Sequence, residues 1–343
     1  MTSSLTLPML SHLRPTLAGA TPPRRARRGR GIQNGLGVGG ALALFLMGSD
    51  AQAEWTEREF DVSQGGRLVL DASIGSVHVQ THDRDQVEVL VARRGPFPLP
   101  DLEMRQEGGD VYIESRDVPV VDWLPAWAGR RVRFEVTVPA HYSIEIETGR
   151  GSITVEDAAG HIEARTGHGR VQFQNLEGTL EARSQGGAIE IDECRGSVDL
   201  VTGGGAIDIE DVEGDITAHT QGGRVRVRDA QGDLDLRTGG GSIRIDGAQG
   251  NVVAHSGGGS IHVHFEDGPE GNLETSGGDI EVWFPAGEAA SLEVAAGGGP
   301  IEVEHPLHLN GAAVQGALAG DVNGGGGALE LRTGGGSVRV REL

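Results

Sequence analysis

The sequence contains no lysine, a single cysteine and few aromatic residues. All 29 basic side chains among its 343 residues are arginine, and phenylalanine, tyrosine and tryptophan together make up only 4% of it. So few large apolar side chains argue against the core of a conventional helical or α/β enzyme. One cysteine excludes an intramolecular disulfide, so the stability of the chain must come from its fold.

Positive charge is scarce as well. The chain has 50 acidic residues against its 29 arginines, which gives a formal net charge of -21. Binding to nucleic acid or to an anionic membrane surface requires a basic face. The sequence therefore predicts neither of these partners.

The first 53 residues have the pattern of a secretory signal peptide. Five arginines between Arg24 and Arg30 precede an apolar run over residues 35–48 and then Ala51-Gln52-Ala53, which is typical of a cleavage site. A transmembrane anchor is the alternative, but glycines interrupt the run and it is shorter than the roughly 20 residues that span a bilayer. We expect cleavage after Ala53, export to the periplasm or the cell exterior, and no stable membrane insertion.

Glycine, in contrast, is abundant, with 57 residues that follow no collagen-like period. From Thr148 the chain repeats every 18 residues, and each repeat opens with a threonine or serine that is followed three residues later by a glycine. A second glycine follows after nine more residues, so each repeat holds two halves of the form G-x-h-x-h, where h is apolar. The openers are Thr148, Thr166, Ser184, Thr202, Thr220, Thr238 and Ser256.

The alternation of apolar and polar residues predicts strands with one buried face, and the glycines supply the tight corners. A constant repeat without insertions is typical of a solenoid. We therefore expect an all-β, single-stranded β-solenoid (β-helix-like) with 18-residue coils, two short strands per coil and irregular capping ends. The hydroxyl groups of the opening threonines and serines should point inward and form a stacked ladder in which they hydrogen-bond to one another. A meander of antiparallel hairpins is the alternative, although its tips would favour Asn-Gly or Asp-Gly over the Thr-Gly-Gly-Gly found here.

Three regions follow from this pattern. Residues 1–53 are the signal peptide, and residues 54–147 form an N-terminal β region with a capping insertion over 93–130. Residues 148–343 carry the repeats, regular at first and then irregular. The insertion contains Trp123 and Trp127, which we expect either to fold over the end of the solenoid or to dock a partner.

Metal binding finds little support in the pattern. Calcium-binding β-rolls place an aspartate two residues after the last glycine, where this chain has Ile207, Val225 and their apolar equivalents. Stacking should bring together the acids Glu190, Asp192, Asp208 and Glu210, either as a loose divalent-ion site or as a solvated face. His262 and His264 share one strand face and are a zinc pair without an evident third ligand, or simply exposed. We therefore assign no metal site.

Other side chains suggest structural roles. We expect cross-coil ion pairs between Asp208 and Arg226, Glu210 and Arg228, and Arg228 and Asp246. Cys194 takes the place of alanine, leucine or valine in other repeats, so it is expected as a buried apolar residue rather than a reactive thiol.

The sequence contains no recognisable set of catalytic residues. The nucleophile motif G-x-S-x-G does not occur, acids are spread over every outward position, and no aromatic cleft is evident along the repeats to stack a sugar. We assign no catalytic residue and no cofactor.

Several segments resemble one known family. They are Phe60-Asp61-Val62, Leu68-Val69-Leu70, Gly75-Ser76-Val77-His78-Val79, the stretch from Arg133 to Pro139, and the Thr148-Gly149-x-Gly151-Ser152-Ile153-x-Val155 repeats. Over about residues 54–343 the chain is similar to the putative-adhesin family of exported bacterial domains of unknown function, the toastrack-like β-strand-repeat proteins. The resemblance implies a β-helix-like solenoid in the cell envelope, and it implies no catalytic motif.

The sequence thus predicts an exported, non-enzymatic cell-envelope solenoid that acts as an adhesin-like scaffold or binding module for an envelope protein or glycan. Two alternatives stay open. One is an envelope enzyme acting on a glycan, and the other is a structural protein that self-assembles into homo-oligomers through the ends of the solenoid.

Overall fold

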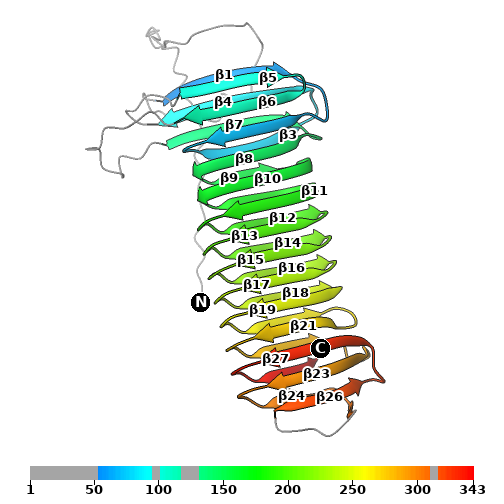
Figure 1. Ribbon diagram of the computed structural model, residues 1–343. Coiled ribbons are helices and arrows are strands. Elements are labelled where there is room, and N and C mark those ends of the chain that lie inside the picture. The colour runs from blue at the N-terminus through cyan, green and yellow to red at the C-terminus, as the bar shows by residue number, and fades with distance from the viewer. Residues whose placement is uncertain (1–52, 95–100, 117–130, 310–315) are drawn as a thin grey trace, which may run out of the picture. The chain divides into compact units, whose positions relative to one another are not determined.

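A computed structural model describes residues 53–94, 101–116, 131–309 and 316–343 (Figure 1). These residues form 28 strands and contain no helix. The predicted signal peptide lies outside the described residues, apart from Ala53, and so do Trp123 and Trp127.

The middle of the chain is a stack of 18-residue coils, and each coil adds one strand to each of two parallel ladders. Equivalent residues of neighbouring coils are paired, as in Ile189 with Ile207 and Val198 with Ile216. The first ladder here contains β12 (Ile189–Arg195), β14 (Ile207–Glu213), β16 (Val225–Gln231), β18 (Ile243–Gln249) and β20 (Ile261–Phe265). The second contains β10 (Ala159–His168), β13 (Val198–Thr202), β15 (Ile216–Thr220), β17 (Leu234–Thr238), β19 (Asn251–Ser256) and β21 (Glu270–Thr275). Strand β11 (Val171–Ser184) turns a corner and belongs to both ladders. The predicted solenoid is confirmed, and parallel pairing excludes the hairpin alternative.

The N-terminal end of the stack does not follow the order of the chain. The coil of β2 (Arg67–Ala72) and β3 (Ser76–His82) lies between a coil that comes later, β6 (Asp110–Arg116) with β7 (Arg131–Pro139), and the coil of β8 (Ser143–Arg150) and β9 (Ile153–Glu156). Antiparallel strands finish this end, namely β5 (Asp101–Glu107) on β6, β4 (Gln86–Arg94) on β7, and β1 (Ala53–Asp61) on β4. Part of the predicted capping insertion, residues 101–116, therefore extends the ladder as β5 and β6.

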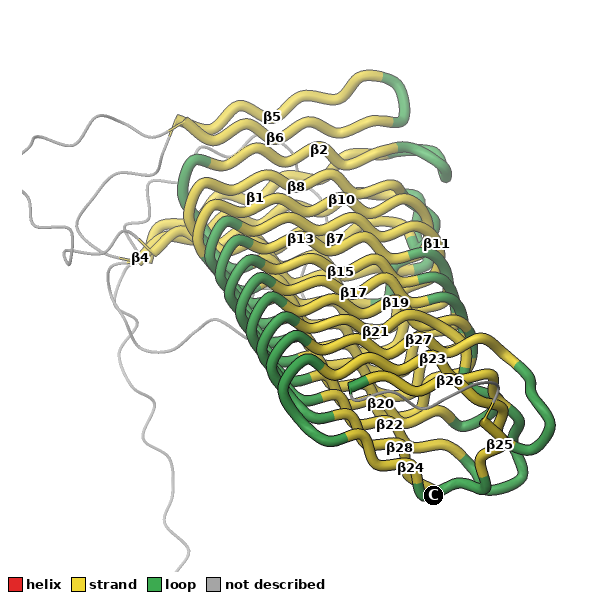
Figure 2. The backbone as a smooth tube through the Cα atoms, turned by 60° about the horizontal axis from the view of Figure 1, so that its bottom comes forward, coloured by secondary structure: helices red, strands yellow, loops and turns green. Residues whose placement is uncertain are grey.

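The C-terminal end repeats this arrangement (Figure 2). Strand β22 (Ile280–Phe284) continues the first ladder from β20. The last coil of the chain, β27 (Gly327–Thr333) with β28 (Val338–Glu342), lies between the β21–β22 coil and the coil of β23 (Ala290–Ala296) and β24 (Ile301–Val303). Strands β26 (Ala317–Val322) and β25 (Leu307–Leu309) then pair antiparallel beyond β23.

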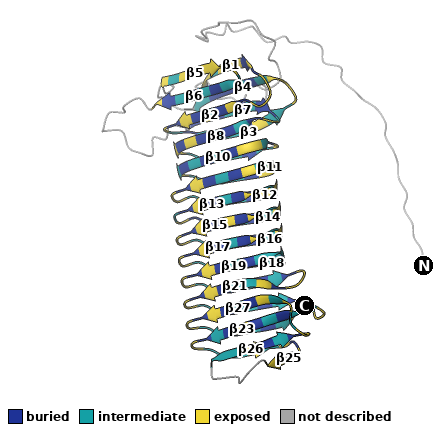
Figure 3. Cartoon of the chain, turned by 45° about the vertical axis from the view of Figure 1, so that its right-hand side comes forward, coloured by how far each residue is buried: buried dark blue, intermediate teal, exposed yellow. Residues whose placement is uncertain are grey.

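Buried residues alternate with exposed or partly buried ones along most strands, as in β13 and β15 (Figure 3). Buried isoleucine, valine, leucine and alanine at equivalent positions form one continuous core. A stack of non-glycine residues with positive φ, which the repeat pattern did not reveal, lies in or directly after five successive strands on this side of the stack, β9, β11, β12, β14 and β16. Its members are Asp157, Asn175, Glu193, Asp211 and Asp229, with φ between 52° and 64°. Aspartate and asparagine tolerate this region better than most residues.

The opening threonines and serines are buried, as predicted, but their hydroxyls bind backbone groups rather than one another. Thr220 Oγ1 donates to the carbonyl of Gly205 in the preceding coil at 2.9 Å, and the N–H of Gly223 donates to Thr220 Oγ1 at 3.1 Å. The same pair of contacts recurs at Thr202 and Thr238. We call this arrangement the corner bridge, because it ties each of these coils to the one before it.

Glycine is required at these corners by close approach of the backbones. A Cβ atom added at Gly223 would lie 1.8 Å from the carbonyl oxygen of Gly205, whereas one added at the adjacent Gly222 would meet nothing within 4 Å. The third glycine of each corner is therefore a packing requirement, and the middle one is not.

Replacing Thr220 by valine should destabilise the fold by about 1–3 kcal/mol, because the Gly205 carbonyl and the Gly223 N–H both lose their partner in a buried corner. Urea unfolding followed by circular dichroism measures the loss. The control is Thr217→Val, at an exposed position of the same strand, which should change the stability little. Equal effects of the two variants would contradict the role of the corner bridge.

Replacing Gly223 by alanine should destabilise the protein by at least the 1–3 kcal/mol typical of overpacking, because the added methyl group has no space. Gly222→Ala is the matched control and should leave the melting temperature nearly unchanged. A Gly223→Ala variant as stable as its control would show that the coils can move apart at the corner without penalty.

Candidate functional site

The outward side chains of the first ladder form two continuous rows, which we call the polar strip. The first row contains Thr154, Gln172, Glu190, Asp208, Arg226, Arg244, His262, Glu281 and Arg339. The second row contains Glu156, Gln174, Asp192, Glu210, Arg228, Asp246, His264, Trp283 and Arg341. Strand alternation places both rows outside the core, and the parallel register aligns them along the stack.

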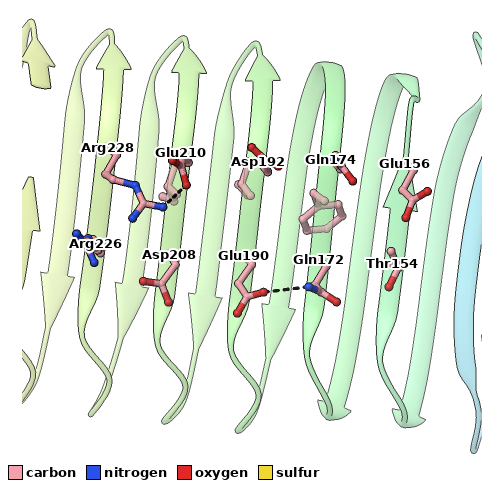
Figure 4. A pocket seen from close by; sticks show the side chains of 13 residues that line it. Thr154, Glu156, Gln172, Gln174, Glu190, Asp192, Asp208, Glu210, Arg226 and Arg228 are labelled. Carbon is pink, nitrogen blue, oxygen red and sulfur yellow. Dashed lines mark hydrogen bonds and ion pairs between the residues drawn. The ribbon is translucent and has the colours of Figure 1, made fainter. Parts of the chain in front are cut away.

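An open groove of about 360 Å³ lies on this strip over β9, β11, β12, β14 and β16 (Figure 4). Four carboxylates from β12 and β14 line its centre, where Glu190 is in register with Asp208 and Asp192 with Glu210. This confirms the predicted stacking of the four acids. Arg226 and Arg228 of β16 line one end of the groove next to them, so its centre is acidic and this end is basic.

Only one of the three predicted cross-coil ion pairs forms. Arg228 hydrogen-bonds to Glu210, and this bond raises the pKa of Arg228. Asp208 instead contacts Arg224 at 3.3 Å, and Asp246 receives a bidentate pair from Arg244 at 2.9 Å.

The predicted pairs Asp208/Arg226 and Arg228/Asp246 are therefore wrong, although both sets of residues are neighbours in register. The reason is that each carboxylate has another arginine within reach. Arg226 makes only a longer contact, 3.9 Å, to Asp246.

Three of the four central acids of the groove, Glu190, Asp208 and Glu210, are engaged by donors from the protein. Glu190 accepts hydrogen bonds from Arg170 at 2.7 Å and from Gln172 at 3.0 Å. Within the described ranges, no three His, Cys, Asp or Glu side chains converge as metal ligands. The groove is thus a mixed-charge surface of ion pairs and amides.

His262 and His264 share one face of β20, as predicted, and each contacts a carboxylate. His262 Nδ1 lies 3.1 Å from Glu281, and His264 Nδ1 lies 3.7 Å from Asp246. The indole of Trp283, on the next strand, joins them with its centroid 4.5 Å from the His264 ring and 6.2 Å from the His262 ring. We call these three residues the histidine–tryptophan cluster.

The sequence pattern did not reveal this cluster, since no aromatic cleft was evident along the repeats. Trp283 lies 19 residues after His264 rather than 18, because the spacing lengthens by one residue between β20 and β22. The signal that could have found it is the apolar alternation of Ile280, Val282 and Phe284, which places Trp283 outward.

Cys194 is buried in register between Leu176 and Val212. Burial raises the pKa of its thiol to about 11. A thiol in such surroundings carries almost no thiolate at neutral pH, so Cys194 is a core residue, as expected, rather than a nucleophile.

Comparison with known proteins identifies one matching protein family. The model of the Toastrack DUF4097 family matches residues 66–277, which is more than half of the chain. No curated protein matches the sequence. The described residues contain no helix with the length and apolarity of a membrane span.

Three solved structures that match this chain have 9–12% sequence identity to it and TM-scores between 0.22 and 0.38. A putative adhesin from Bacteroides fragilis has 11% identity and a TM-score of 0.38 and covers 84% of this chain and 97% of its own. A putative lipid binding protein from Parabacteroides distasonis has 12% identity and a TM-score of 0.37, covering 85% and 98%. A putative cell adhesion protein from Clostridium sporogenes has 9% identity and a TM-score of 0.22, covering 84% and 100%.

The stability of the fold should depend on the protonation of His264. Burial, with smaller contributions from Arg244 and His262, lowers the pKa of this imidazole, against the opposing effect of Asp246. A lowered pKa means that the folded state favours the neutral ring. The contribution of His264 to the stability of the fold is therefore present above the pKa of the unfolded state, near 6.5, and is lost as the pH falls through the pKa of the folded state.

We therefore expect the loss of stability between pH 7.5 and 5 to be smaller in a His264→Gln variant than in the unchanged protein. Urea unfolding at the two pH values tests this, with the exposed His219→Gln as a control for removal of a histidine. An equal or steeper loss in His264→Gln would contradict the assignment.

Proposed function

The chain belongs to the Toastrack DUF4097 family, and we propose that it is an exported, non-enzymatic binding module of the cell envelope that engages its partner through the polar strip. At a coarse level, membership in this family supports an adhesin-like toastrack scaffold. The observation that carries the finer proposal is the unbroken double row of charged and polar side chains on a ladder of paired strands.

The ladder favours binding because it fixes the position of every group on the strip. Neighbouring coils repeat at roughly 4.8 Å, and the corner bridges hold each coil to the next. A surface ordered before binding loses little conformational entropy when a partner docks. An extended partner can therefore contact several coils at once.

An enzyme that cleaves glycans is the alternative suggested by the acidic residues of the groove. Such enzymes use a protonated acid in apolar surroundings together with a second carboxylate at a defined distance. Three of the four central carboxylates of the groove instead contact arginine, namely Glu190 with Arg170, Asp208 with Arg224 and Glu210 with Arg228. This neutralisation favours recognition over acid catalysis.

Self-assembly through the ends of the stack is the second alternative. Strand β1 presents Glu54, Glu57, Arg58 and Glu59 as exposed side chains at one end, and β25 at the other end has only three residues. Charged or very short edge strands are how proteins discourage edge-to-edge pairing. We therefore favour a partner of a different kind over end-to-end association.

Export completes the proposal. Residues 1–53 have the signal-peptide pattern, and a net charge of -21 disfavours anionic surfaces and leaves envelope proteins and uncharged glycans as partners.

Retention of a partner from envelope extract tests the proposal. The purified protein, immobilised, should retain a specific component, and reversing the charges of the strip with Arg226→Glu and Arg228→Glu should weaken retention about tenfold, or about 1.4 kcal/mol. The control makes the same change of charge on the second ladder, with Arg183→Glu and Arg237→Glu, and should retain the component as the unchanged protein does. If nothing is retained, or if both variants lose it equally, the strip is not the binding surface.

A further inference from the structure

The polar strip changes character along the stack. Over β12, β14 and β16 it presents carboxylates and arginines, whereas over β20 and β22 it presents two imidazoles and an indole. Trp283 is half-buried in the second row, between His264 of β20 and Arg341 of β28. An aromatic residue held at the surface between polar neighbours is typical of binding surfaces.

The charges around the histidine–tryptophan cluster compensate one another. Glu281 contacts His262 at 3.1 Å and Arg339 at 3.1 Å, and the hydrogen bond to Glu281 raises the pKa of Arg339. Arg339 also contacts Glu302 at 3.4 Å. On the other side, Asp246 is held by Arg244. The surface beside the indole is therefore close to neutral in a chain whose net charge is -21.

This compensation selects the kind of ligand. A cation would have to displace Arg339 or Arg244 from its carboxylate, and an anion would meet Glu281, Glu302 and Asp246 close to these two arginines. A neutral ligand faces neither cost, provided that it can both donate and accept hydrogen bonds. It should also have an apolar face to lie against the aromatic rings.

We propose that the histidine–tryptophan cluster and its flanking ion pairs bind a neutral oligosaccharide. The C–H face of a pyranose ring matches the aromatic surface, and its hydroxyl groups donate to the carboxylates and accept from the guanidinium groups. This inference rests on the proposed function and names the class of partner for one part of the strip.

The geometry of the stack supports an extended ligand. The rows run along the stack axis with a step of roughly 4.8 Å per coil, which is close to the length of one sugar unit in an extended β-linked chain. Successive sugar rings would therefore meet successive strands from β18 to β28. Only the ring at β22 meets the indole, so Trp283 should dominate the affinity.

Calorimetric titration of the purified protein with cellotetraose, chitotetraose and laminaritetraose tests the proposal, with tetragalacturonate as the charged comparison. We expect at least one neutral tetraose to bind and to change the tryptophan fluorescence, and tetragalacturonate to bind at least tenfold more weakly. Trp283→Ala should weaken the binding at least tenfold. Trp55→Ala, at an exposed tryptophan of β1, is the matched control and should bind as the unchanged protein does.

A second variant separates loss of binding from loss of folding. Trp283→Leu keeps an apolar side chain against the strand but removes the aromatic face, so it should unfold at nearly the same temperature as the unchanged protein and still lose the tetraose. The proposal is overturned if no neutral tetraose binds, if Trp283→Leu binds as well as the unchanged protein, or if tetragalacturonate binds more tightly than the neutral probes.

The two proposals fail in different ways. Retention of an envelope protein that depends on Arg226 and Arg228, without binding of any tetraose, would overturn the oligosaccharide site and leave the binding module in place. Retention of nothing from the envelope extract would instead overturn the binding module itself.

Discussion

In the coils opened by Thr202, Thr220, Thr238 and Ser256, a buried hydroxyl satisfies two backbone groups at once. It donates to a glycine carbonyl of the preceding coil and accepts from a glycine N–H three residues further along, as Thr220 does with Gly205 and Gly223. Both backbone groups lie at a corner, where no neighbouring strand can pair with them, and an unpaired buried group costs about 1–3 kcal/mol. Glycine is needed on both sides because a side chain would collide with the facing carbonyl. This contact recurs at the spacing of the coil, and it accounts for the constant length of the repeat and for the third glycine of each corner.

The register that these corners impose determines the surface. Once equivalent residues are paired coil by coil, every outward position of the first ladder belongs to a row. The chemistry of a row is then set by the residues that recur at the spacing of the coil. Acids, arginines, imidazoles and an indole are thereby brought side by side although they lie far apart in the sequence. The result is an extended recognition face with compensated charges, rather than a pocket around one reactive group. Binding by many weak, ordered contacts is the activity that suits such a face.

The features that depend on the 18-residue period could be predicted from the sequence. Coil length, the two parallel ladders, the buried openers, the stacked acids and the core position of Cys194 all follow from the 18-residue repeat. The order of the end coils does not, because the pattern of β27 and β28 fits beside β21 and β22 as well as that of β23 and β24 does. The position of Trp283 was not predicted because one added residue shifts it out of the 18-residue period. The ion pairs of Asp208 and Asp246 could not be predicted, since exposed pairs differ by less than about 1 kcal/mol and several arginines are within reach.

The fixed rows of the polar strip require corners that are held as firmly as the strands. Amide hydrogen exchange, followed residue by residue by nuclear magnetic resonance, measures this directly at Gly205, Gly223 and Gly241, whose N–H groups donate to the threonine hydroxyls. The account predicts that these amides exchange as slowly as the core strand amide of Ile207, which donates to the next coil at 2.9 Å. Exchange at the corners that is faster by orders of magnitude would mean that they open independently, and the rows of the polar strip would then have no fixed frame.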